Sequence, residues 1–115
     1  MDPISSALIA KALDGLAMRY EATATNIANA NSREYRPVRV TFEAALREAA
    51  GQGTSAIRAV RPEAEHAAPL AAGTEMRLDL ELASAAETAN RYAALIDLLS
   101  RQTQIARAVI STGQQ

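Results

Sequence analysis

Apolar side chains recur at intervals of three and four along the N-terminal quarter of the chain. We call these positions the N-terminal stripe; they are Ile9, Leu13, Leu16, Tyr20, Thr23, Ile27 and Ala30. This heptad spacing predicts a coiled-coil helix over residues 1–31. Asp2 followed by Pro3 favours a start there, because a carboxylate caps the first free amides and proline suits the first helical position. Gly15 costs this helix about 1 kcal/mol relative to alanine, which indicates either a close helix contact or a tolerated weakness.

A second stripe of the same period lies near the other end of the chain. We call it the C-terminal stripe; it comprises Leu78, Leu82, Ala85, Ala89, Tyr92, Ile96, Leu99, Thr103, Ala106 and Ile110. No glycine or proline interrupts the chain between Thr74 and Thr112, so the sequence predicts a second coiled-coil helix over residues 75–115. Further apolar residues widen the stripe toward its end, namely Leu95, Leu98, Ile105 and Val109. That widening predicts a half that is buried on more than one side.

Three asparagines mark the end of the first helix. Asn26, Asn29 and Asn31 lie within residues 26–35, which we call the joint and which ends in Tyr35. Short amide side chains compete for backbone hydrogen bonds, so they are poor in helix interiors and favour caps and turns. We expect Asn31 to terminate the helix, while Asn26 and Asn29 are also candidates to bridge to backbone groups of an adjacent subunit.

The segment after the joint changes period. Apolar and polar residues alternate over residues 37–42, which predicts an extended segment. A short helix is expected over residues 42–50, with Thr41 as its possible cap. Residues 51–74 combine prolines, glycines and alanines, so we expect a flexible excursion with one short strand at residues 56–61.

These elements predict an all-α fold, with the two long helices paired antiparallel and elongated around a small irregular middle region, residues 32–74. All three parts form one domain. The predicted helices are about 42 and 50 Å long at about 1.5 Å per residue, whereas a compact chain of this size has a radius of gyration of about 13 Å. The chain also holds 27 alanines, which bury little area. We therefore expect a subunit whose helix surfaces are completed by neighbours.

Charge and composition exclude several classes of function. The net charge is -1, and the only basic cluster, Arg33, Arg36 and Arg39, is interrupted by Glu34, so nucleic-acid binding is not expected. There is no cysteine and therefore no thiolate metal site. No apolar stretch approaches the ~20 residues of a membrane span, and no cleaved secretory signal is expected at the N-terminus.

The sequence contains few residues in arrangements that catalysis requires. His66 is the only histidine, and with Glu63 and Glu65 it could imitate a metal site. A surface segment is the simpler interpretation of these three residues. No phosphate-binding loop, nucleophile motif or supported pair of carboxylates is present. We expect no enzyme activity, no cofactor, no metal and no small-molecule substrate.

The joint and its surroundings resemble the axial proteins of the bacterial flagellum. The resemblance rests on residues 24–31 with Tyr35, on residues 38–46, and on residues 78–81 and 90–101. The joint of that family usually contains Pro-Gly before the tyrosine, whereas this chain has residues 32–34, Ser-Arg-Glu. We expect Arg33 and Glu34 to hold the turn through side-chain contacts.

The resemblance implies a structural subunit of the proximal rod of the basal body. It implies export by the flagellar type III route without a cleaved signal peptide, and a final periplasmic location. The implied partners are copies of the chain itself, other rod proteins such as FlgC, and the basal-body adaptor and export-gate components. It further implies that helical ends, largely unfolded in the exported monomer, become ordered when neighbours cover them. The candidate subunit-packing residues are Leu13, Leu16, Tyr20, Ile27, Leu82, Tyr92, Ile96 and Leu99.

Phe42 and Leu46 match a short pattern that early flagellar export substrates present to the export gate. Their spacing equally predicts an i, i+4 pair that packs on a short helix. Two other functions stay open. One is FlgC itself, and the other is a cytoplasmic helical adaptor or export chaperone that binds a partner helix in a groove.

Overall fold

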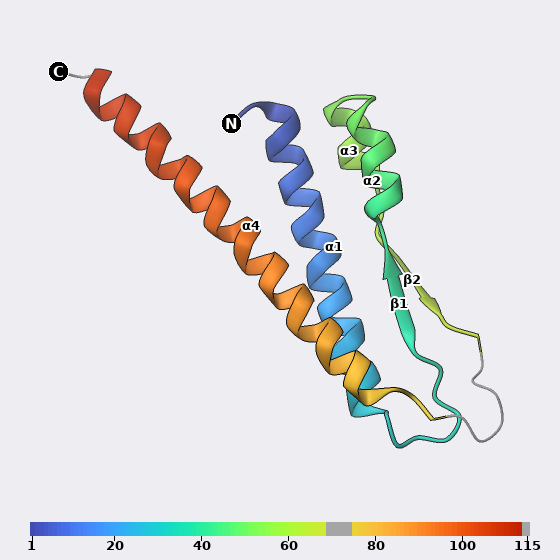
Figure 1. Cartoon of the computed structure of the whole chain (residues 1–115). Coiled ribbons are helices and arrows are strands. Elements are labelled where there is room, and N and C mark those ends of the chain that lie inside the picture. The colour runs from blue at the N-terminus through green and yellow to red at the C-terminus, as the bar shows by residue number, and fades with distance from the viewer. Residues whose placement is uncertain (69–74, 114–115) are drawn as a thin grey trace.

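The computed structural model describes residues 1–68 and 75–113 of the chain. Its elements, in order, are α1 (Pro3–Ala28), β1 (Val38–Thr41), α2 (Glu43–Ala50), α3 (Thr54–Ala59), β2 (Glu63–His66) and α4 (Leu78–Gly113). The molecule is elongated, with principal extents of 69 × 27 × 14 Å (Figure 1). The mostly helical fold with two long terminal helices is confirmed. Residues 69–74 and 114–115, the ends of the predicted excursion and of the second predicted helix, lie outside the described residues.

Helix α1 begins and ends where its sequence favours it. The Oδ1 atom of Asp2 accepts a hydrogen bond of 2.8 Å from the amide of Ser5, and Pro3 is the first helical residue. This arrangement confirms the predicted N-cap. At the other end Asn29 is the C-cap, and its side-chain amide donates a 2.8 Å hydrogen bond to the carbonyl of Thr25. An asparagine therefore terminates the helix, but it is Asn29; the prediction that Asn31 does so is wrong.

The hydrophobic core lies between α1 and the middle region. Its buried members are Leu16, Val40, Phe42, Leu46, Ala49, Ile57 and Val60. The predicted short helix agrees with α2, but the prediction of a flexible, irregular excursion is wrong for its described residues 51–68, because they include α3 and β2. The short strand expected at residues 56–61 is also wrong, since that stretch contains the end of α3, and Ile57 from this helix is completely buried.

Gly15 allows the closest approach of two segments in the core. A Cβ atom placed on this residue would lie 2.5 Å from the Cδ1 atom of the Phe42 ring, well inside any real contact. Of the two alternatives for Gly15, a close contact is therefore the one that holds, although the neighbour is the ring of Phe42, which precedes α2, and not another helix. The aromatic ring rests directly on the backbone of α1.

Strands β1 and β2 form a small antiparallel sheet. The pairs run from Val38 opposite His66 to Thr41 opposite Glu63. Every residue of β2 is exposed, so this strand covers the edge of β1 without adding side chains to the core. The predicted extended segment agrees with β1, but Thr41 does not cap α2; Phe42 occupies that position without a side-chain cap bond.

Helix α4 contacts α1 near the joint and then separates from it (Figure 1). Only Glu81 and Thr88 of α4 are buried. The widened apolar half, which we expected to be buried on more than one side, is instead largely exposed within the single chain; Ile105 is 56% exposed and Val109 66% exposed. Among the described helices, none is long and apolar enough to cross a membrane.

Candidate functional site

Asn26 is the centre of the joint. Its side chain is completely buried, and its Oδ1 atom accepts hydrogen bonds from the Tyr35 hydroxyl and from the Val38 amide, both at 2.8 Å. Its Nδ2 atom donates to the carbonyl of Val38 at 3.0 Å and to the Oε2 atom of Glu81 at 3.2 Å. These four bonds use the full capacity of a side-chain amide. The hypothesis that Asn26 bridges to an adjacent subunit is therefore wrong for this folded chain.

Glu81 brings the start of α4 to the joint. This carboxylate is 2% exposed, and its Oε1 atom lies 2.6 Å from Nη1 of Arg39, whose side chain is half exposed. We call Asn26, Tyr35, Arg39 and Glu81 the joint cluster. It connects α1, the joint, β1 and α4 through hydrogen bonds and one ion pair. Burial raises the pKa of Tyr35, and the nearby negative charge of Glu81 raises it further.

The turn before Tyr35 is made by backbone groups. The amide of Ser32 donates to the carbonyl of Asn29, and the amide of Tyr35 donates to the carbonyl of Ser32. Arg33 and Glu34 are exposed, and neither side chain forms a hydrogen bond or ion pair with any described residue. The prediction that these two side chains hold the turn is wrong. Asn31 is exposed in the same turn.

Phe42 and Leu46 are both buried in the core. The amide of Leu46 donates to the carbonyl of Phe42 at 2.9 Å, and the guanidinium carbon of Arg19 lies 4.9 Å from the centre of the Phe42 ring. The packing interpretation of this pair therefore describes the folded chain. Recognition of the same pair by an export gate stays a prediction, and it requires a chain in which the pair is exposed.

Arg19 also fixes the start of α2. Its Nη1 and Nη2 atoms donate to the two carboxylate oxygens of Glu43 at 2.7 and 2.6 Å, and Nη2 also donates to the carbonyl of Val40 at 2.7 Å. The hydrogen bonds from Arg19 lower the pKa of Glu43 to about 2. This fork-shaped arrangement holds α1, β1 and α2 in one geometry. The sequence offered no signal for it, because 24 residues separate the two partners.

The candidate subunit-packing residues differ in their surroundings. Leu16 is buried in the core, and Leu13, Ile27 and Leu99 are half-buried. The other four are exposed; they are Tyr20, Leu82, Tyr92 and Ile96. The single chain thus leaves half of these side chains available to neighbours.

Two different stripes run along α4. The least exposed residues form the inner stripe, which contains Glu81, Ala85, Thr88, Leu95, Leu99 and Gln102. The C-terminal stripe shares only part of this set, and its members Leu82 and Ile96 lie one position further along and are exposed. One residue corresponds to about 100° around a helix of 3.6 residues per turn. The periodicity in the sequence therefore identified mainly a face that the single chain does not cover.

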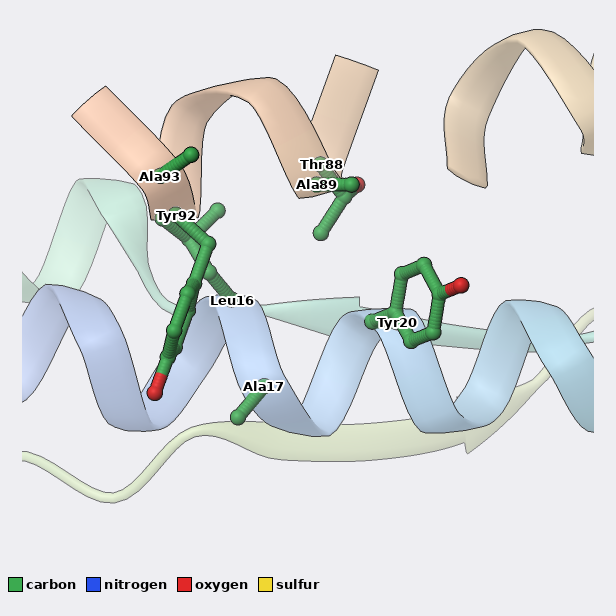
Figure 2. A pocket seen from close by; sticks show the side chains of 7 residues that line it. All are labelled: Leu16, Ala17, Tyr20, Thr88, Ala89, Tyr92 and Ala93. Atoms are coloured by element: carbon green, nitrogen blue, oxygen red, sulfur yellow. The ribbon is translucent and has the colours of Figure 1, made fainter. Parts of the chain in front are cut away.

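Two apolar grooves lie where α4 separates from α1. The first has a volume of about 320 Å³ and is lined by Leu16, Ala17, Tyr20, Thr88, Ala89, Tyr92 and Ala93. Figure 2 shows that Tyr92 projects from α4 toward α1, and that Leu16 and Ala17 lie between it and Tyr20. The second, of about 670 Å³, lies between α1, α2 and α4; its apolar lining includes Leu8, Leu46, Leu95 and Leu98.

His66 does not belong to a metal site in the described structure. It lies on the exposed strand β2, and its Nδ1 atom is 3.1 Å from the carbonyl of Arg36. The described residues contain no group of three or more histidine, cysteine or acidic side chains that could hold an ion. Here His66 serves the backbone pairing of the small sheet.

The surfaces available for binding are therefore the two apolar grooves and the exposed apolar residues of α4. The start of α4 is held by the buried polar residues of the joint cluster. Comparison with models of known protein families finds no match, and a search of curated proteins finds no similar sequence.

Proposed function

We propose that the chain is a structural subunit of the proximal rod of the bacterial flagellar basal body, of the kind represented by FlgB. The exposed apolar surface of α4, which lies on both sides of the inner stripe, carries this proposal. Its exposed large side chains are Leu82, Tyr92, Ile96, Leu98, Ile105, Val109 and Ile110. Apolar surface of this extent is unusual on a monomer and typical of an assembly interface. The sequence resemblance of the joint to the flagellar axial proteins supplies the kind of assembly.

In the proposed assembly, α1 and α4 pair antiparallel within each subunit, and neighbouring subunits cover the exposed apolar surface of α4. The inner stripe serves the contact within the chain. The exposed members of the C-terminal stripe serve contacts between chains, where heptad spacing permits coiled-coil packing. Leu98, Ile105 and Val109, on the other side of the helix, serve further contacts between chains. A subunit with one helix face for itself and another for its neighbours can extend into a filament, provided that the contacts do not close into a ring.

In the proposed assembly, the two ends of α4 also become ordered at different stages. Its first turns are held by Glu81 and Thr88, both buried against the rest of the chain. From Thr103 to Gly113 every residue is exposed. We expect this last segment to be ordered chiefly when neighbours bury it, so that the free energy of assembly stabilises the helix.

Replacing an exposed apolar residue by a charge tests the proposal. Ile105→Asp should abolish rod assembly and motility in a strain that depends on the gene, because it buries a charge in the interface between subunits. Gln104→Asp introduces the same charge one position away and should be tolerated. Motility and purified basal bodies with Ile105→Asp at the level of the unaltered chain would refute the proposal.

Two alternatives remain, and one has its own structural support. The groove between α1, α2 and α4 has an apolar lining, which favours a helical adaptor or export chaperone that binds a partner helix. The other is FlgC, the related rod protein. Fractionation separates the classes: a rod subunit is recovered with basal bodies, whereas an adaptor is recovered with the cytosol. Complementation then separates FlgB from FlgC: the gene should restore motility only to the strain that lacks the corresponding rod protein.

A further inference from the structure

The fully buried contacts of α4 lie near its start, while Leu95 packs half-buried against the core further along the helix. Its two buried residues, Glu81 and Thr88, lie within its first third, and both are polar. Helices in water-soluble domains are usually held by buried apolar side chains. The start of α4 is held instead by a carboxylate, which makes its position unusually specific.

A buried carboxylate is stable only where charged or polar partners replace water. Arg39 supplies the charge at 2.6 Å and Asn26 supplies an amide hydrogen at 3.2 Å. If α4 slipped by one residue, Leu80 or Leu82 would face these polar groups and Glu81 would lose both. The pairing therefore selects one register of α4 against α1.

The same asparagine also organises the joint. Asn26 accepts from the Tyr35 hydroxyl and exchanges two bonds with the backbone of Val38, so the entry to β1 depends on its orientation. The fourth bond of this amide goes to α4. A single buried side chain thus touches both the end of the joint and the beginning of the last helix.

We propose that the joint cluster is a latch that couples the docking of α4 to the order of the joint. With Glu81 in place, the amide of Asn26 is fixed and the chain from Tyr35 to Val38 follows it. Without Glu81, the first turns of α4 and the joint loosen together, while α2 and α3 keep their contacts with α1. This coupling acts within the free chain and does not depend on the proposed assembly.

Residue-resolved amide hydrogen exchange on the full chain tests the latch. In Glu81→Ala, exchange should quicken about 10- to 100-fold for the amides of residues 82–90 and for those of the joint, as expected for loss of a hydrogen-bonded charge. Residues 46–50 and 57–60 should keep their protection. Glu87→Ala is the matched control, because it removes an exposed carboxylate of the same helix, paired with Arg91 at 2.7 Å, and should change neither segment.

Arg39→Met provides a second variant that leaves the carboxylate in place. Since the buried Glu81 carboxylate then lacks its charge partner, the loss of Arg39 should also quicken exchange in the same two segments by about 10- to 100-fold. Unequal responses, with α4 loosened and the joint unchanged, would overturn the coupling. Equal loss of protection throughout the chain, or no loss in Glu81→Ala, would also overturn it.

Discussion

The core around Phe42 and the second half of α4 differ in how far their apolar side chains are buried. The core is built partly from alanines and single apolar residues in the middle region, yet Ile57 and Phe42 are almost completely buried. The second half of α4 carries a denser apolar pattern, yet Ile105 and Val109 are mostly exposed. Apolar density along the sequence therefore does not show which side chains the single chain buries. Under the proposed assembly, it marks side chains that are buried either within the chain or between subunits.

The largest difference in stability is expected when one apolar side chain of each region is truncated to alanine. Phe42→Ala should lower the free energy of unfolding of the monomer by about 3–5 kcal/mol, because it leaves a cavity beneath α1. Ile105→Ala should change it by no more than about 0.5 kcal/mol, because the side chain already faces water. Urea denaturation of the dilute monomer measures both. Similar losses for the two variants would remove the distinction between the regions.

A smaller effect is expected at the point where Phe42 meets α1. Gly15→Ala should destabilise the monomer by about 1–3 kcal/mol through overpacking, although alanine favours helix by about 1 kcal/mol. Phe42→Leu in the same chain should relieve the clash, so that the double variant loses less than the sum of the single losses. Stabilisation by Gly15→Ala would show that the ring moves aside freely.

The smallest effect concerns the ion pair beside the core. The pKa of Glu43 is lowered from 4.5 to about 2, so its contribution to stability is complete above pH 4.5 and is lost as the pH falls toward 2. Glu43→Gln should therefore destabilise the monomer near pH 7 by about 1 kcal/mol, since the Glu43 side chain is 45% exposed and solvent screens the pair in part. The difference from the unaltered chain should vanish near pH 2, as measured by denaturation across this range. A difference independent of pH would contradict the assignment.

The terminal helices could be predicted because their signals are local. Asp2 with Pro3 marks the start of α1, the asparagines mark its end, and heptad spacing indicates both long helices. The middle region could not be predicted in the same way, because its order depends on contacts distant in sequence. Phe42 fits against α1 only because Gly15 has no side chain. Helix α3 begins after Gly53, whose φ of 106° is a conformation that glycine adopts easily.

The joint shows what local patterns can and cannot reveal about a site. Asn26 and Tyr35 stood out in the sequence, but the bond between them and the role of Glu81 did not. A carboxylate on the inner stripe of α4, seven residues before Thr88, was the available signal. Its meaning depended on Arg39 and Asn26, which the chain brings together only when folded.

In the proposed assembly, neighbouring subunits cover the exposed apolar surface of α4. The chain has no cysteine, so one introduced thiol is unique. Thiol labelling of Ile105→Cys should be rapid in the free subunit and strongly slowed in assembled basal bodies, whereas Ala49→Cys, in the buried core, should be slow in both. Equal labelling of Ile105→Cys in the free and assembled states would contradict the claim.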